Sequence, residues 1–236
     1  MIGFSQKITV DVHDVDFNGI CRASALMKYI QSTAQMQLTD IGLTYDALKA
    51  QGKAFILSRI KLEFTDTAEA YDNLEAITFP CESRGFSFIR CYQLMKGSKC
   101  IGRAASIWAL VDINNHSLVK VNDFHLPLEL GVPLDISVGH IRMPSDMISV
   151  GTYRVTYGDL DQNRHVNNTE YADIYSNYLP LDGKRIDSIS IHYANEARWG
   201  EELNVLLKEC DGFYYIRTVK PDGKINSEAE IHLTDI

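Results

Sequence analysis

A polar stretch in the second half of the chain carries residue types that can move protons. It runs from Gly158 to Asn168, and Glu196 follows at the end of a later strand-like run. Histidine and glutamate act as general acids or bases near neutral pH. An extended backbone would place Asp161, Asn163 and His165 on one side of the stretch. The pattern predicts a proton-transfer site; the plain alternative is a solvated histidine among turn-forming Asp and Asn residues.

A helix is expected directly after this stretch, over 168–179. Asn167 or Asn168 can cap it, and Glu170 has the capping-box spacing from Asn167. The free N–H groups and the positive dipole end at such a helix start suit an oxyanion that develops during a reaction. The helix start therefore belongs to the predicted site.

An internal repeat supplies a comparison for these residues. Three blocks recur in one order, and they are 14–20 with 159–165, 62–67 with 191–196, and 85–90 with 212–217. Ile20 takes the place of His165 and Thr67 that of Glu196, so only the second half has both proton-transfer side chains. We interpret the chain as a duplication with one working site.

Period-2 alternation dominates the sequence and predicts strands, because alternate side chains of a strand face opposite sides. The strand-like runs are 4–12, 54–65, 72–83, 86–96, 99–112, 149–157, 185–194, 201–209, 212–220 and 225–235. Ala, Leu, Met and Gln at 23–38 predict a long helix, and extra residues in the first half predict a short one over 42–51. Each half thus buries one helix against an antiparallel sheet. The expected parts are an N-terminal domain over 1–113, a connecting segment over 114–148 and a C-terminal domain over 149–236.

The composition excludes several classes of function. The chain has 23 Lys and Arg against 31 Asp and Glu, and its net charge of −8 disfavours nucleic acid as the main ligand. The five cysteines include no C-x-x-C pair and the seven histidines no metal-binding spacing, so we expect no metal. No nucleotide-binding glycine motif occurs, and we expect no cofactor. We also expect no membrane span, no signal peptide and a cytoplasmic location.

These residues resemble those of the acyl-ACP thioesterases of plants and bacteria. The resemblance rests on the string D-Q-N-R-H-V-N-N-T-E-Y from Asp161 to Tyr171 and on the segment from Ile191 to Glu196. It extends over most of the chain. It implies an α+β tandem, or double, hotdog fold, in which two antiparallel sheets each wrap around a long helix. It also implies hydrolysis of fatty acyl-ACP to free fatty acid and acyl carrier protein.

Carried over residue by residue, the family's catalytic network falls on Asp161, Asn163, His165 and Glu196. Plant members commonly have a cysteine directly after the glutamate, whereas this chain has Ala197 there. A covalent acyl-cysteine route is therefore not expected. We expect His165 and Glu196 to activate a water, Asn163 to orient that water or the carbonyl group, and Asp161 to hold its two neighbours. Which of His165 and Glu196 takes the proton stays open.

The resemblance further implies an acyl pocket in the first half and an acidic carrier protein as partner. The candidate pocket residues, whose spacing is also that of an ordinary core stripe, are Met27, Ile30, Ala34 and Leu38. The candidate docking residues are Lys184, Arg185 and Arg198. The competing interpretations are an acyl-CoA thioesterase, a hotdog dehydratase and a non-catalytic acyl-binding module. A duplicated chain permits a monomer and leaves a homodimer open.

Overall fold

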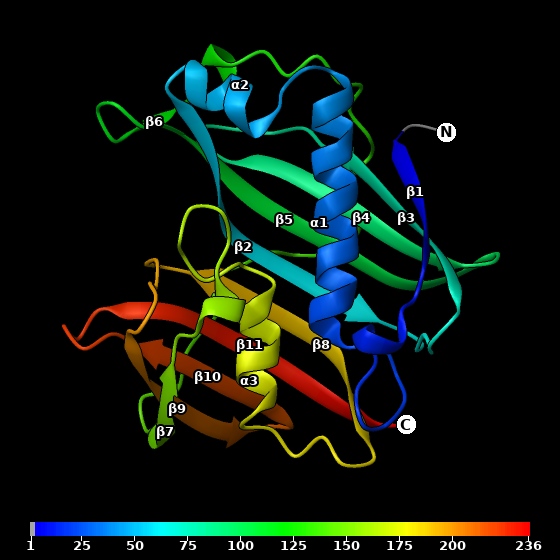
Figure 1. Cartoon of the computed structure of the whole chain (residues 1–236), viewed down its shortest axis with the longest axis vertical. Helices are drawn as coiled ribbons and strands as arrows, with labels where there is room; N and C mark the ends of the chain where they lie inside the picture. Colours follow the sequence, from blue (N-terminus) through cyan, green and yellow to red (C-terminus); the bar gives the residue numbers. More distant parts are fainter. Residues whose placement is uncertain (1–2) are drawn as a thin grey trace.

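The computed structural model describes residues 3–236, which form an 11-stranded antiparallel sheet with helices on one face (Figure 1). The strands are β1 (Phe4–Thr9), β2 (Lys53–Phe64), β3 (Asn73–Pro80), β4 (Phe88–Lys96), β5 (Lys99–Asp112), β6 (Ser117–Val119), β7 (Ile148–Arg154), β8 (Lys184–Tyr193), β9 (Glu202–Cys210), β10 (Phe213–Val219) and β11 (Ile225–Asp235). The helices are α1 (Ala23–Asp40), α2 (Tyr45–Ala50) and α3 (Glu170–Ser176), with short 3-10 turns η1 (Val12–Asp14), η2 (Val121–Asp123) and η3 (Tyr157–Asp159). Every predicted strand is confirmed, and β6 is a short strand that the alternation did not predict.

The two halves of the chain meet edge to edge. Along the sheet the strand order is β1-β3-β4-β5-β2-β8-β11-β10-β9-β7, and β6 pairs with β5 outside this path. The junction is the antiparallel pairing of 59–63 in β2 with 188–192 in β8. Figure 1 shows α1 crossing the strands of the first half and α3 crossing those of the second. The α+β double hotdog expected from the sequence is confirmed, with its two sheets joined into one.

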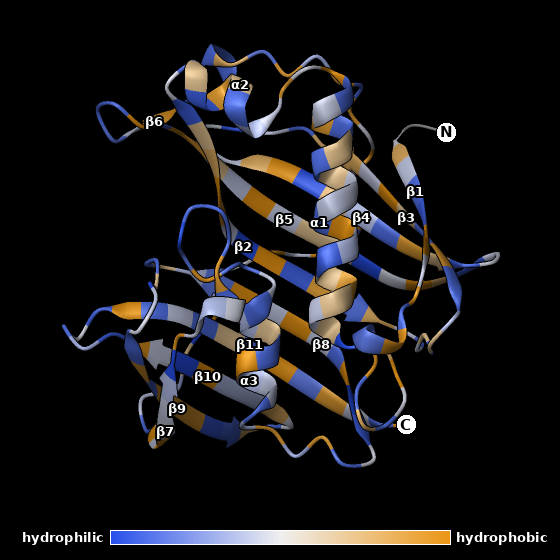
Figure 2. Cartoon of the chain, viewed as in Figure 1, coloured by the Kyte–Doolittle hydropathy of each residue, from blue (hydrophilic) through white to orange (hydrophobic). Residues whose placement is uncertain are grey.

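Helix α1 forms because one of its faces is apolar and the sheet can bury that face. Its buried side chains include Leu26, Met27 and Ile30, which belong to the main core together with residues of β2, β3 and β4. Figure 2 shows the alternation of apolar and polar residues along the strands beneath it. The helix spans 18 residues, as the 23–38 pattern predicted to within two residues.

Helix α3 is shorter than expected, and this corrects the prediction of a long second helix. It has 7 residues, and i to i−3 hydrogen bonds from Tyr178 and Leu179 tighten the chain beyond its end. Pro180 disfavours a helical conformation at Leu179, so the helix cannot continue. The expected capping box is also absent from this end in the described structure, because Glu170 forms an ion pair with Lys28 of α1 at 2.7 Å.

The duplication is visible as two copies of one loop. In the first half, the backbone bridges are Val15 with Cys21 and Ile20 with Glu69. In the second half, the bridges at the matching positions are Leu160 with Val166 and His165 with Arg198. The two loops therefore have the same path, and the side chains at 20 and 165 occupy the same place in it.

The third repeat block is out of register by an odd number of residues. Arg90 faces α1, because it donates to Gln37 of that helix. Arg217, which the sequence block pairs with it, lies on the outer face of β10 beside Glu228, at 2.6 Å. Side chains of a strand alternate between faces, so equivalent positions cannot differ in this way. The match of 85–90 with 212–217 is therefore wrong in register, whereas the other two blocks are consistent with the structure.

The segment between the halves covers the outer face of the first sheet. A second apolar cluster lies there, formed by Ile77, Phe79, Cys81, Cys91 and Ala105. The connecting segment packs against it through Leu134, Ile136 and Val138. The first half thus has apolar contacts on both faces of its sheet. The connecting segment covers the outer face, so a cavity can form only on the face toward α1.

Candidate active site

The loop that carries His165 is a tight turn, not the extended stretch that its sequence suggested. Asp161 Oδ1 accepts hydrogen bonds from the backbone N–H groups of Asn163 at 2.8 Å and His165 at 3.3 Å. The Arg164 N–H donates to Asp161 O at 3.0 Å, and the Asp161 N–H donates to His165 O at 2.8 Å. Arg164 has a φ of 64°, in the left-handed region that favours glycine. Asp161 thus shapes the loop mainly by binding its backbone.

His165 and Glu196 meet from two different loops. His165 Nε2 lies 3.0 Å from Glu196 Oε2, with 22% of the histidine side chain and 57% of the glutamate side chain exposed. The Val166 N–H donates to Ala197 O at 2.9 Å and ties the loops together beside this pair. Glu196 Oε1 has no hydrogen-bond partner among the described residues. The pair therefore offers one free carboxylate oxygen that can accept a proton from a bound water.

Asn163 has a partner that sequence reasoning missed. The hydroxyl of Tyr45, the first residue of α2, donates to Asn163 Oδ1 at 2.6 Å. Asn163 Nδ2 donates to Asp161 Oδ2 at 3.2 Å. An amide nitrogen has two N–H groups, so the second one is free to donate. The only sequence signal for Tyr45 was the extra short helix of the first half, which has no counterpart in the second.

The start of α3 offers a further donor. The backbone N–H of Asn168 has no partner within the described part of the chain, whereas the Thr169 N–H donates to Asn167 Oδ1 at 3.1 Å. The hydroxyl of Tyr193, at the end of β8, donates to Asn168 O at 2.8 Å and fixes this peptide. Burial raises the pKa of the Tyr193 hydroxyl, so it stays a neutral donor. Asn168 can therefore present its N–H to an oxyanion.

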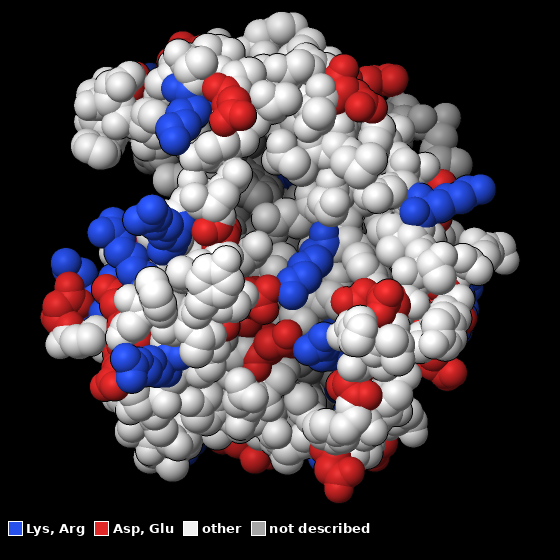
Figure 3. Space-filling model, viewed as in Figure 1, with Lys and Arg blue, Asp and Glu red and all other residues white. Residues whose placement is uncertain are grey.

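The side chains of the candidate site line one large cavity between α1, α2 and the loop that carries His165. Its volume is about 1230 Å³, more than the roughly 300–1,000 Å³ of typical small-molecule sites. Figure 3 shows the molecular surface hollowed beside α1. The cavity lining includes apolar residues of the first half, such as Leu38, Phe55, Phe88 and Trp108. Asp161, Asn163, His165, Asn168 and Glu196 line the same cavity.

The four expected acyl-pocket residues divide into two pairs. Ala34 and Leu38 line the cavity. Met27 and Ile30 are each 1% exposed and lie in the main core, outside the cavity lining. The earlier turns of α1 therefore serve to hold the helix on the sheet, and its later turns border the cavity.

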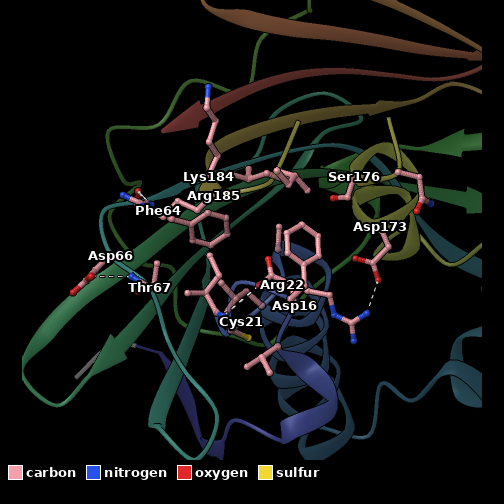
Figure 4. A pocket seen from close by; sticks show the side chains of 18 residues that line it. Asp16, Cys21, Arg22, Phe64, Asp66, Thr67, Asp173, Ser176, Lys184 and Arg185 are labelled. Atoms are coloured by element: carbon pink, nitrogen blue, oxygen red, sulfur yellow. Dashed lines mark hydrogen bonds and ion pairs between the residues drawn. The ribbon is translucent and has the colours of Figure 1, made fainter. Parts of the chain in front are cut away.

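The first-half copy of the site borders a separate, smaller pocket. It has a volume of about 380 Å³, and Figure 4 shows Asp16, Thr67, Lys184 and Arg185 among its lining. Lys184 and Arg185 thus lie beside the first-half copy of the loop, away from the cavity that His165 lines. Of the three expected docking residues, Arg198 alone is next to the loop that carries His165, through its backbone bridge with that residue.

Metal-binding clusters and membrane-spanning helices are both absent from the described residues. Among residues 3–236, no cluster of three or more His, Cys, Asp or Glu side chains could hold a metal ion. In the same range, no helix combines the length and apolar character needed to cross a bilayer.

Comparisons with known proteins identify relatives of the whole chain. The family model for the acyl-ACP thioesterase N-terminal domain matches residues 2–126, and that for the acyl-ACP thioesterase C-terminal domain matches residues 144–235. No curated protein matches the sequence. Among solved structures, an acyl-ACP thioesterase from Bacteroides thetaiotaomicron is similar with a TM-score of 0.81 and 22% identity, over 98% of this chain and 97% of that one. A 12:0-ACP thioesterase from Umbellularia californica has a TM-score of 0.83 and 14% identity, over 99% and 98% of the chains. At such identities the structural likeness establishes the fold alone.

Proposed function

The chain belongs to the acyl-ACP thioesterase family and hydrolyses the thioester of acyl-ACP, and we propose that His165 and Glu196 together activate the attacking water. The observation that carries this proposal is the 3.0 Å contact between His165 Nε2 and Glu196 Oε2 at the edge of the large cavity. Imidazole and carboxylate side chains serve as general bases in enzymes, and both groups of this pair come from one chain.

In the proposed reaction, a water binds between the His165–Glu196 pair and the thioester carbonyl. The pair accepts a proton from the water as its oxygen attacks the carbonyl carbon. The C–S bond of the tetrahedral intermediate then breaks, and the departing sulfur takes the proton back from the pair. The products are a free fatty acid and the thiol of the carrier.

Asn163 and Asn168 are proposed to stabilise the charge that develops on the carbonyl oxygen. Asn163 has one N–H left after its bond to Asp161. Because the Tyr45 hydroxyl binds the amide oxygen of Asn163, the orientation of the amide is fixed and the remaining N–H is free to donate. The free backbone N–H of Asn168 supplies a second donor. Loss of a single such donor typically costs about 3–4 kcal/mol of transition-state stabilisation.

A covalent acyl-enzyme has no support at position 197. Ala197 is 0% exposed and belongs to the main core, so its side chain points away from the cavity mouth. Of the five cysteines only Cys81, which directly follows β3, appears in the cavity lining, and it is buried in the apolar cluster on the outer face of the sheet. Water is therefore the proposed nucleophile.

The acyl chain is proposed to occupy the first-half part of the cavity, against Ala34 and Leu38. For the carrier protein we propose a docking surface around the catalytic loop, formed by Arg164, Arg198 and Lys49. All three are exposed, and Figure 3 shows basic side chains gathered on that side of the hollow. A positive surface here would complement an acidic carrier despite the net charge of −8.

We further propose a cytoplasmic monomer. The five cysteines are free thiols, which fits a reducing compartment. One chain also contains both halves of the fold and the Tyr45–Asn163 contact between them. The site therefore needs no second subunit.

The test is hydrolysis of a panel of acyl-ACPs and the matching acyl-CoAs by wild type, H165A and E196A. We expect wild type to release fatty acid from acyl-ACP and both variants to lose this activity while they keep their melting temperature. A charge-reversed R164E/R198E variant should raise KM for acyl-ACP much more than for acyl-CoA. Equal or better turnover of acyl-CoA would contradict the carrier assignment, and bound but uncleaved acyl chains would indicate a binding module.

A further inference from the structure

Arg90 is a buried cation in the wall of the acyl cavity. It lies in β4 on the face toward α1, is 7% exposed and lines the same cavity as His165. Its neighbours on the same face of β4 are Phe88 and Tyr92, both buried and aromatic. A guanidinium group is unexpected on a surface that otherwise suits a hydrocarbon chain, because burying a charge is costly unless it is paired.

The guanidinium is only partly satisfied by the protein. Its Nη1 donates to Gln37 Oε1 at 2.6 Å and to Thr78 Oγ1 at 3.0 Å. Nε and Nη2 have no partner among residues 3–236, and neither of them is fully enclosed by the protein. The three N–H donors on these two nitrogens are therefore left without a protein acceptor, and the fork of Nε and Nη2 has the geometry with which an arginine binds a carboxylate through two hydrogen bonds.

No carboxylate of the described chain neutralises this charge. The acidic residues in the cavity lining are Glu82, Asp161 and Glu196. Glu82 is paired with Arg84 at 3.4 Å, Asp161 binds its own loop, and Glu196 binds His165. Burial lowers the pKa of Arg90, and the groups that oppose this effect are Tyr92 and Cys81, not an acid.

Arg217 offers a comparison within the same chain, because it lies outside the cavity lining and has a carboxylate partner. Arg217, in β10, is bound by Glu228 through Nε at 2.8 Å and through Nη2 at 2.6 Å. These are the same two nitrogens that Arg90 leaves unpaired. At Arg90 no carboxylate of the described residues takes the corresponding place.

We propose that Arg90 binds a carboxylate at the far end of the acyl chain, so that the preferred substrates are carrier thioesters of dicarboxylic acids. The proposal rests on the proposed function, because it assumes that the acyl chain lies in this cavity during hydrolysis. Gln37 and Thr78 hold the guanidinium, and the fork of Nε and Nη2 binds the carboxylate. The preferred acyl chain is then the one whose length spans the distance between the loop that carries His165 and the guanidinium of Arg90.

The test compares matched pairs of acyl-ACPs with four to twelve carbons, ending either in a methyl group or in a carboxylate. For wild type we expect kcat/KM to favour the carboxylate-ended chain by at least about tenfold over one narrow range of lengths. In R90M, a change that removes the charge but keeps an unbranched side chain, the preference should reverse. R90K keeps the charge without the fork and should fall between the two.

Each outcome either supports or overturns the proposal that Arg90 binds a terminal carboxylate. A wild-type enzyme that cleaves methyl-ended chains as well as or better than carboxylate-ended ones at every length overturns this inference and leaves the proposed function intact. An unchanged preference in R90M or R90K also overturns it. If R90M does not fold, as judged by circular dichroism, the wild-type panel and R90K still decide. Cleavage of neither series would instead overturn the proposed function.

Discussion

The hydroxyl of Tyr45 donates to Asn163 Oδ1 at 2.6 Å, although 118 residues separate them. The tyrosine starts the short helix α2, which the second half of the duplication lacks, and the asparagine lies in the second-half loop that carries His165. The first half therefore supplies a residue that orients the candidate site, as well as the wall of the cavity. Both halves are needed to set the direction of the Asn163 amide.

Replacing Tyr45 by phenylalanine should lower kcat by about fivefold to tenfold, since a net hydrogen bond of about 1 kcal/mol then no longer orients Asn163. KM should change little, because the phenol is proposed to act through Asn163. Steady-state hydrolysis of acyl-ACP measures both constants. Tyr71→Phe, at an exposed tyrosine outside the cavity lining, is the matched control and should behave as wild type. An unchanged kcat in Y45F would remove the proposed role.

The duplicated loops allow a paired test of Asp161. Asp16 Oδ1 accepts from Asn18 N–H at 2.8 Å and Ile20 N–H at 3.3 Å, the same distances that Asp161 makes in its own loop. Asp161→Ala and Asp16→Ala should each cost about 1–2 kcal/mol of unfolding free energy. Only D161A should also reduce kcat, by about 100-fold, because it displaces His165 and Asn163. Urea unfolding and kinetics on the same preparations check this, and a comparable loss of kcat in D16A would contradict it.

Cysteine at position 197 should not create a nucleophile. The side chain there is 0% exposed and faces the core, so a thiol would lie away from the substrate. We expect A197C to keep kcat within about threefold of wild type, to resist iodoacetamide at that residue, and to lose about 1 kcal/mol of stability from overpacking. Mass spectrometry of the enzyme during turnover should detect no acyl adduct. Acylation of the introduced thiol, or a gain in kcat, would show that the site can run a covalent route.

His192 should make the fold less stable at acidic pH. Its imidazole is partly buried on the outer face of β8 near Arg59, Glu228 and His140, and burial followed by Arg59 lowers its pKa below the ordinary value. The neutral form is thus favoured in the folded state. Its contribution is complete above the unfolded pKa of about 6.5 and is lost as pH falls through the folded pKa. Between pH 7 and pH 5, wild type should therefore lose more unfolding free energy in urea titrations than H192Q, and an equal loss in both would contradict this.

The elements of the fold could be predicted from the sequence because they rest on local periodicity. Alternation placed each of the ten main strands within a few residues, and it did so because each strand has one face in the core. The length of α3 could have been corrected from Pro180, which disfavours helix at the preceding residue. Comparing residue types could not determine the register of the block at 85–90. Similar residues also occur at positions that face the opposite side of the sheet, so an alignment shifted by an odd number of residues looks equally good.

The residues of the candidate site that differ between the two repeats could be predicted from the sequence. Its contacts between distant segments of the chain could not. The difference between Ile20 and His165 drew attention to the loop, and the structure brings Asp161, Asn163, His165 and Glu196 together. Tyr45 comes from another half of the chain, and no local pattern links it to Asn163. Lys184 and Arg185 begin β8, whereas Glu196 follows the other end of that strand, so the two basic residues border the other pocket.

Arg90 did leave a signal in the sequence. It interrupts an alternating strand at an inward position, between Phe88 and Tyr92. A charged residue on a core face is rare unless it is paired. Its partner lay beyond what spacing could predict, since Gln37 is on α1 and Thr78 on β3.

The most direct test of the central claim is a double-mutant cycle on kcat with H165A, E196A and the combined variant, with acyl-ACP as substrate. If the two side chains activate one water as a unit, each single change should cost about 10³-fold, and the double change little more than either. Circular dichroism and melting temperature should confirm that all three variants fold. Additive losses, or a single variant that keeps most of the wild-type rate, would contradict the account.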